Sequence, residues 1–263
     1  MPELPEVETV VRSLAPHIPG RRILDAEFHS RFVTPGDFEQ LRCHLVGCTI
    51  IGIERRGKFI VVTLDDGVLV IHLGMTGKLL LDASRTAHTH AIFTLDGGLL
   101  LYDDIRQFGR IEWSPALPLR VAKLGPDPLE ISFDEFYRQL HRRKTRIKPL
   151  LLSQSFLRGL GNIYADEILF HAGIHPNASA ARLSKSRAQR LHQAMREVLR
   201  LAIEHRGSSI SDYVDAGGNK GSFQLLHQVY GREGKPCPRC GTPIHRILIA
   251  QRGTHYCAKC QRR

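Results

Sequence analysis

Residues 58–73 read KFIVVTLDDGVLVIHL, and this stretch decides the fold of the first half of the chain. Two apolar runs flank Asp65-Asp66-Gly67, whose residues are typical of tight turns. Runs rich in β-branched residues around so short a turn predict an antiparallel hairpin. Strands are expected at 23–28, 49–54, 58–64, 68–73, 77–81, 90–95, 99–102 and 110–113. Closely spaced antiparallel strands predict a β-sandwich or barrel.

Helical periodicity marks the amino terminus and the second half. Val7, Val10, Val11 and Leu14 recur at helical spacing. The segment 115–128 carries four prolines and reads as a linker. Helices are expected at 5–16, 35–45, 133–142, 147–153, 163–172 and 184–204, and a Gly-rich mobile loop at 207–221.

Charge is distributed unevenly along the chain, which has a formal net charge of +11. Residues 1–131 hold 14 Lys and Arg against 17 Asp and Glu, whereas residues 132–263 hold 23 against 9. A strongly basic half favours nucleic acid as a partner, with solvated surface cations as the plainer alternative. No apolar run approaches the length of a membrane span, and the acidic start MPELPE differs from a signal peptide. We therefore expect a cytoplasmic protein without a membrane partner.

Four of the six cysteines form the pairs CPRC and CAKC near the end of the sequence. This spacing predicts one zinc ion held by Cys237, Cys240, Cys257 and Cys260. Four thiolates leave no open position for water, so the zinc is expected to fold the intervening segment 244–256 as a hairpin rather than to catalyse. A redox dithiol is the alternative.

The amino terminus carries the least ordinary pattern. Once Met1 is removed, Pro2 has a free amine, and an α-amino pKa of about 7.7–8.0 leaves part of it neutral at pH 7. A neutral amine can attack a sugar C1′ or an aldehyde to form a Schiff base, and the neighbouring Glu3 and Glu6 can move the protons. Acidic residues and Pro5 at an ordinary helix start are the alternative.

Several other residues suit a DNA substrate. Asn162, in the Gly-rich stretch 159–167, can hold a phosphate at a helix start or merely cap that helix. Met75, Arg106 and Phe108 suit the filling of the hole that an extruded base leaves, although core packing is the alternative for Met75 and Phe108. Three lysines are candidates to act on a substrate, and a solvated surface position is the alternative for each: Lys58, Lys148 and Lys220.

These separated motifs, in this order, resemble the formamidopyrimidine-DNA glycosylases, bacterial enzymes that remove oxidised purines. The resemblance spans essentially the whole chain, from PELPEVET at 2–9 through 159–167 to the cysteines. Leu4, Val7 and Thr9 favour this branch over the sister endonuclease VIII branch, which favours oxidised pyrimidines.

The resemblance implies base-excision repair by a bifunctional glycosylase and abasic-site lyase. It would excise 8-oxoguanine and formamidopyrimidines from damaged double-stranded DNA through a Schiff base on Pro2, and then cut the strand by β,δ-elimination. It implies Glu3 as proton donor, Glu6 as supporting acid and Lys58 as proton donor in β-elimination. The space that the extruded base leaves in the duplex would be filled by Met75, Arg106 and Phe108.

The resemblance further implies that Asn162 and Arg252 bind phosphates of the DNA, and it places Arg252 among the catalytic residues. Other DNA contacts would come from His88, Arg106 and Lys148, and the loop at 207–221 would close over the flipped base. Ile105 and Gln107 depart from the family pattern, in which a proline and a second basic residue are common. This departure leaves the preference for the opposite base open.

The expected fold class is α+β. It comprises a catalytic β-sandwich or barrel domain over 1–131, a helical (helix–two-turn–helix) DNA-binding domain over 132–228 and a zinc-finger hairpin over 229–263. We expect a monomer that works on DNA in the bacterial nucleoid. The rival from another class is a non-catalytic zinc-finger protein that binds distorted duplex, against which Pro2, Glu3 and Lys58 together argue.

Overall fold

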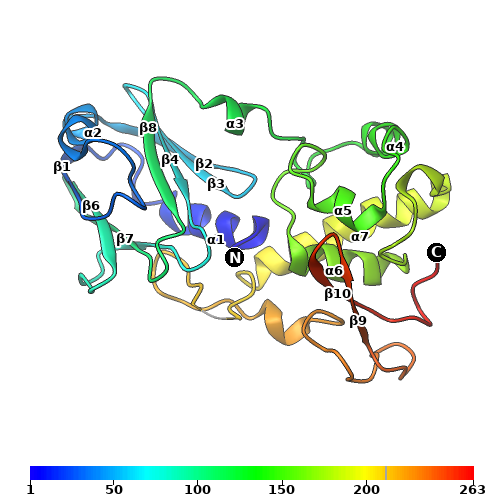
Figure 1. The fold of residues 1–263 in the computed structure, drawn as a ribbon. Coiled ribbons are helices and arrows are strands. Elements are labelled where there is room, and N and C mark those ends of the chain that lie inside the picture. Colours follow the sequence, from blue (N-terminus) through cyan, green and yellow to red (C-terminus); the bar gives the residue numbers. More distant parts are fainter. Residues whose placement is uncertain (211) are drawn as a thin grey trace. The chain divides into compact units, whose positions relative to one another are not determined.

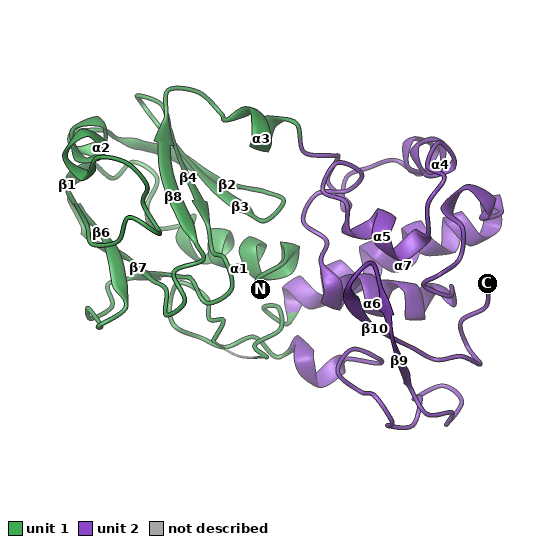
Figure 2. Ribbon diagram, in the orientation of Figure 1, with its two compact units in different colours: residues 1–123, 205–222 green, residues 124–204, 223–263 purple. Residues whose placement is uncertain are grey.

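The protein is described by a computed structural model that covers residues 1–210 and 212–263. Its chain forms two compact units, residues 1–123 with 205–222 and residues 124–204 with 223–263 (Figures 1 and 2). The α+β prediction is confirmed, because antiparallel sheets dominate the first unit and helices the second. The expected division into three domains stays a prediction.

The first unit is built on two four-stranded antiparallel sheets, ordered β1-β6-β7-β5 and β2-β3-β4-β8. The hairpin expected around Asp65-Asp66-Gly67 is formed by β3 and β4, with Val61 opposite Val70. The strands are β1 Ile23–Phe28, β2 Ile50–Arg56, β3 Phe59–Leu64, β4 Val68–His72, β5 Lys78–Leu81, β6 Thr89–Leu95, β7 Gly98–Asp103 and β8 Arg110–Ser114.

One apolar cluster of the first unit draws residues from both sheets. Phe28 and Phe93 of the first sheet meet edge to face, with ring centroids 5.9 Å apart, and Ile71 of the second sheet belongs to the same cluster. The helices of this unit are α1 Leu4–Leu14, α2 Phe38–Leu45 and the short α3 Leu119–Ala122, which lies within the expected linker. The apolar stripe of α1 is buried in this cluster, so the amino terminus is fixed to the sandwich.

The segment 205–222 belongs to the first unit although it follows α7 in the chain. Tyr213 and Ala216 lie in the apolar cluster. Ala216 accepts a hydrogen bond from Leu81 at 2.9 Å and donates one to Ser13 Oγ at 3.1 Å. The loop expected at 207–221 is therefore tied to β5 and α1 in the described part; residue 211, within it, lies outside the described residues.

The second unit is organised around α6, whose residues are almost all buried. This helix packs on α5, α7 and β10, and it ends at Gly173, whose φ of 67° is the left-handed conformation that favours glycine. The helices are α4 Phe133–His141, α5 Ile147–Leu152, α6 Asn162–Ala172 and α7 Lys185–Glu204, with single 3₁₀ turns at Ala180–Arg182 and Phe223–Leu226.

The C-terminal hairpin consists of β9 His245–Ile249 and β10 Arg252–Tyr256. The chain leading into it is held by Glu167 of α6, whose carboxylate accepts the N–H groups of Gln228, Val229 and Tyr230 at 2.8–3.0 Å. Across the described residues, no helix combines the length and apolarity that a bilayer span requires.

The aromatic contact in the sandwich gives a stability prediction. Phe93→Ala is expected to lower the free energy of unfolding by about 3–5 kcal/mol, because Phe93 is 1% exposed and its removal leaves a cavity. Urea denaturation measures this loss. Leu24→Ala is the matched control on β1, where the side chain is 52% exposed; a similar loss in both variants would contradict the assigned core.

Candidate active site

The predicted nucleophile lies at the buried start of α1. Pro2, Glu3 and Glu6 are all buried. One oxygen of the Glu6 carboxylate accepts the N–H of Glu3 at 2.8 Å, and the other accepts the N–H of Ser208 at 2.7 Å. Two main-chain N–H groups thus hold this carboxylate, and it in turn fixes the backbone immediately after Pro2.

The approach of 207–208 to Glu6 requires glycine. Gly207 has a φ of +75°, and a Cβ at this position would lie 2.6 Å from Glu6 Oε1. Tyr213 adds a second tie by donating its hydroxyl hydrogen to the Glu6 carbonyl at 3.1 Å. Burial and the nearby Glu6 charge raise the pKa of Tyr213, so this hydroxyl stays protonated and remains a donor.

Lys58 lies at the turn from β2 to β3, and it has a histidine neighbour that the sequence reasoning missed. His72, at the end of β4, pairs across the sheet with Phe59, the residue after Lys58. Burial and then the Lys58 charge lower the pKa of His72 to about 4. His72 Nδ1 accepts the N–H of Gly74 at 3.2 Å, so its neutral ring carries the proton on Nε2 and presents a donor.

The structure brings Met75, Arg106 and Phe108 together. The Arg106 guanidinium lies 3.2 Å from Met75 Sδ and 4.6 Å from the centroid of the Phe108 ring. Met75 is 39% exposed and Phe108 53% exposed, so the alternative that these two residues belong to the core is wrong. Together they form an apolar group with one cation at the surface of the first unit.

Asp104 positions two loops, the one that carries Met75 and the one that carries Arg106. The sequence analysis did not predict this role. This residue is fully buried. Its carboxylate accepts the Thr76 hydroxyl at 2.5 Å and the Gly109 N–H at 2.8 Å, and the Arg106 N–H lies 3.3 Å from it. Both loops are thus fixed to one charged group, which is the reason that Met75 and Arg106 share a surface.

Ile105 and Gln107, which depart from the family pattern, lie in the loop that carries Arg106. Ile105 is half exposed, and Gln107 has a φ of +53°, which is uncommon for a residue with a side chain. Ser30 donates its hydroxyl hydrogen to Gln107 Oε1 at 2.5 Å and so stabilises this conformation. His88 is exposed just before β6, and its carbonyl accepts the N–H of Asp104 at 3.0 Å.

In the second unit, Asn162 and Lys148 converge on the hairpin. Asn162 Nδ2 and Lys148 Nζ both donate to the carbonyl of Gly253, at 2.9 and 3.0 Å. Lys148 also donates to Thr254 Oγ1 at 2.8 Å. Asn162 Oδ1, in contrast, is buried and has no hydrogen-bond partner within the described residues. The amide therefore has an acceptor to offer to a further donor.

Lys148 is fully buried and forms an ion pair with Asp166 of α6 at 2.7 Å. The other Asp166 oxygen accepts the N–H of His255 at 2.8 Å. This burial favours a positioning role for Lys148 over a direct DNA contact. The network fixes Gly253 and Thr254, and with them the exposed Arg252 at the start of β10.

The four predicted zinc ligands are assembled at the base of the hairpin. Their Sγ atoms all lie within 4.8 Å of one another, with Cys237 to Cys260 at 3.9 Å and Cys240 to Cys257 at 3.5 Å. A tetrahedron with Zn–S bonds of about 2.3 Å separates its sulfur atoms by about 3.8 Å, so the group fits one zinc ion. The chain forms one structural zinc site, as predicted.

Comparison with known proteins identifies the family. Three family models match in succession: the formamidopyrimidine-DNA glycosylase N-terminal domain at residues 1–111, its H2TH domain at 124–214, and the zinc finger found in FPG and IleRS at 234–263. The chain belongs to the formamidopyrimidine-DNA glycosylase family. A family member from Solibacter usitatus is 58% identical over 100% of both chains.

Solved structures of the family agree in fold. A Lactococcus lactis FPG mutant in complex with Fapy-dG-containing DNA is 40% identical, with a TM-score of 0.89 over 100% of both chains. The MutM (FPG) protein from Thermus thermophilus is 42% identical, with a TM-score of 0.89 over 99% of this chain and 98% of the other. The predicted resemblance is confirmed.

The zinc site gives a prediction with an internal control. The purified protein is expected to hold one zinc ion per chain, and Cys237→Ser is expected to lose it, because three thiolates cannot complete the tetrahedron. Metal analysis after dialysis measures the content. Cys43→Ser is the matched control, since Cys43 is exposed and lies outside the cluster. Loss of zinc from both variants would disprove the assignment.

The position of His72 gives a second prediction. In the folded protein its pKa is expected near 4, against 6.5 in the unfolded chain. Its contribution to stability is therefore complete above about pH 6.5 and is lost as the pH falls through about 4.

NMR titration of ¹³C-labelled histidine measures this pKa, and His72→Gln assigns the signal. Lys58→Gln is expected to raise the pKa only in part, because burial is the larger cause of its lowering. A wild-type signal that titrates near 6.5 would show that His72 is solvated.

Proposed function

We propose that this chain excises oxidised purines from duplex DNA in base-excision repair and then cleaves the strand at the abasic site. The family is named for a DNA glycosylase, and Lactococcus lactis relatives were solved with Fapy-dG-containing and abasic-site-containing DNA. Damaged double-stranded DNA is thus the proposed partner and a monomer the proposed form. In a bacterial cell, this substrate would place its work in the nucleoid.

The observation that carries the proposal is the fixed backbone around Pro2. The Glu6 carboxylate anchors the N–H of Glu3 and therefore the residue that follows the proline. After Met1 is removed, Pro2 becomes a secondary amine with restricted freedom. A positioned amine loses less entropy when it reacts than a mobile one, which favours covalent catalysis.

The first proposed step is displacement of the damaged base. The neutral nitrogen of Pro2 attacks the sugar C1′, the bond from C1′ to the base nitrogen breaks, and the base leaves with its electron pair and accepts a proton. Glu3 is the proposed donor, since it is 3% exposed and adjacent to Pro2. The Pro2 nitrogen then loses its proton and its electron pair breaks the bond from C1′ to O4′. That proton ends on O4′, and a ring-opened iminium ion remains.

The second proposed stage is strand cleavage. The iminium acidifies the C2′ proton; its loss expels the 3′ phosphate oxygen, and loss of the C4′ proton expels the 5′ one. Lys58 is the proposed proton donor in the first elimination. We assign a phosphate contact to Asn162, because its Nδ2 donates one hydrogen to the Gly253 carbonyl and has a second to offer. Further phosphate contacts are assigned to Arg252 and His88, which are exposed. Lys148 positions Arg252 through Gly253.

The exposed group on the first unit suits the extruded state of the DNA. When a nucleotide is flipped out, an apolar side chain that enters the stack offsets part of the lost stacking energy. Met75 and Phe108 are the proposed wedges, and Arg106 the contact to the orphaned base. Gln107 stands where a basic residue is common, so it is the proposed source of any altered preference for the opposite base.

Borohydride trapping tests the proposal. The processed protein is expected to form a covalent adduct with a duplex that carries 8-oxoguanine opposite cytosine, because borohydride reduces the iminium. The same chain with Met1 retained as formyl-methionine is expected to form none, since the Pro2 nitrogen is then an amide. Glu3→Gln is expected to slow excision by about 100- to 10,000-fold.

Each other outcome has a defined meaning. Equal trapping with and without Met1 would exclude Pro2 as the nucleophile. Tight binding without any trapping or cleavage would favour a non-catalytic protein that binds distorted duplex. Trapping only on oxidised pyrimidines would keep the mechanism and replace the substrate class. An undamaged duplex of the same sequence is the control.

A further inference from the structure

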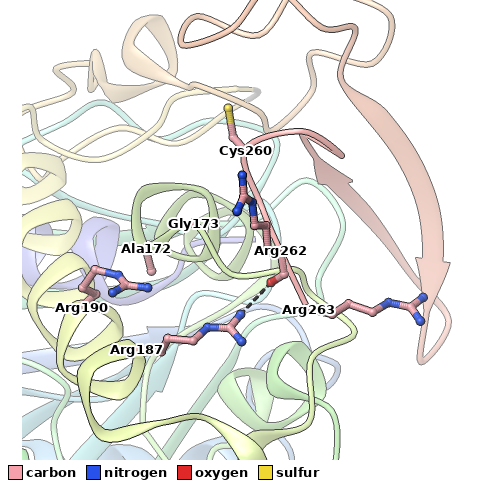
Figure 3. Close-up of a pocket in the computed structure, with 7 residues that line it drawn as sticks. All are labelled: Ala172, Gly173, Arg187, Arg190, Cys260, Arg262 and Arg263. Atoms are coloured by element: carbon pink, nitrogen blue, oxygen red, sulfur yellow. Dashed lines mark hydrogen bonds between the residues drawn. The ribbon is translucent and has the colours of Figure 1, made fainter.

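A pocket of the second unit is lined by arginine side chains (Figure 3). It has a volume of about 410 Å³ and lies where the start of α7, the end of α6 and the last residues of the chain meet. Its charged lining consists of Arg187, Arg190, Arg262 and Arg263. In Figure 3, Arg187 and Arg190 extend from α7 toward the segment that carries Arg262.

Within the described part of the chain, these cations have no carboxylate at ion-pair distance. No acidic side chain lines the pocket, and no ion pair of the described residues involves any of the four arginines. Arg187 donates to the carbonyl of Arg262 at 2.7 Å, which satisfies one N–H group but leaves its charge uncompensated. Burial and then the neighbouring Arg190 lower the pKa of Arg187. The two guanidinium groups therefore repel each other in the absence of an anion.

The zinc centre does not cancel this charge. Cys260 lines the pocket, and four thiolates on one zinc ion carry a net charge of −2. Four guanidinium groups exceed that charge, and two of them lie on α7 rather than on the zinc-binding segment. The pocket therefore keeps a positive balance when zinc is bound.

The pocket is also separate from the phosphate contact proposed at Asn162. Asn162 is the first residue of α6, whereas Ala172 and Gly173 of the pocket lie at its other end. A helix of this length spans about 15 Å, which is more than twice the spacing of successive phosphates on one DNA strand. The arginines here are thus not part of the phosphate contacts assigned to Asn162 and Arg252.

We propose that this pocket binds a phosphate group, held between the guanidinium groups of Arg187, Arg190 and Arg262. Planar guanidinium forks match phosphate oxygens in pairs, and charge-assisted bonds of this kind are the strong ones. The phosphate comes either from the backbone of a DNA segment away from the lesion or from a soluble phosphate. This inference does not depend on the reaction proposed for Pro2.

The first measurement titrates the zinc-loaded full chain with inorganic phosphate, at ionic strength held constant with chloride. The arginine Nε–H signals of Arg187 and Arg190 in ¹⁵N NMR are expected to shift with saturation. Arg190→Gln is expected to weaken the response of Arg187 at least several-fold. The Arg190 side chain is exposed and makes no hydrogen bond to the rest of the described chain, so its replacement is expected to leave the fold intact.

Arg200→Gln is the matched control, because Arg200 is exposed on the same helix ten residues beyond Arg190. It removes an identical charge outside the pocket and is expected to leave the phosphate response unchanged. The proposal is overturned if phosphate moves no arginine signal of the pocket, or if both variants weaken the response equally.

The second measurement identifies the source of the phosphate. Affinity for undamaged duplex is determined over a range of salt concentrations for the wild type and both variants. If DNA backbone occupies the pocket, Arg190→Gln makes the negative slope of log K against log salt shallower by about 0.9, and Arg200→Gln does not. A phosphate response in the first measurement with an unchanged slope assigns the pocket to a soluble phosphate.

Discussion

Buried carboxylates that accept hydrogen bonds from more than one segment of the chain are the main constraint on this structure. Glu6 binds the N–H of Ser208, 202 residues away, and that of Glu3. Asp104 holds the Arg106–Gly109 loop, and Asp166 holds the hairpin at His255. A buried carboxylate is costly unless it is fully hydrogen-bonded. Each therefore tolerates only one arrangement of the segment it binds, and catalytic geometry follows from that requirement.

The buried carboxylates have a different proposed role in each unit. In the first unit, carboxylates fix the proposed nucleophile and the proposed wedge residues on the sandwich. In the second, Asp166 compensates the buried Lys148, and the pair orients Gly253. A buried ion pair contributes little net stability, but the loss of one partner is costly. Here the ion pair holds the zinc-bound hairpin in one specific position on α6.

Local sequence patterns predicted the features that local physics determines. Two apolar runs around a short turn located the hairpin at Asp65-Asp66-Gly67, and the cysteine spacing located the zinc ligands. The roles of Asp104 and His72 were missed, because each depends on segments brought together only by the sheet. The hydrogen bond between Ser208 and Glu6 was missed for the same reason, because these residues lie near opposite ends of the sequence. Side-chain burial separated Lys148 from the surface lysines.

The long separation between Glu6 and Ser208 has a consequence for the order of biosynthesis. Removal of Met1 requires a peptidase to bind the first residues, yet Pro2 and Glu3 are buried in the folded chain, in which Glu6 binds Ser208. The ribosome makes residue 208 late. Glu6 therefore has no Ser208 N–H to bind while most of the chain is being translated. The peptidase thus has a long interval in which to remove Met1, because the hydrogen bond between Glu6 and Ser208 forms only after residue 208 has been made.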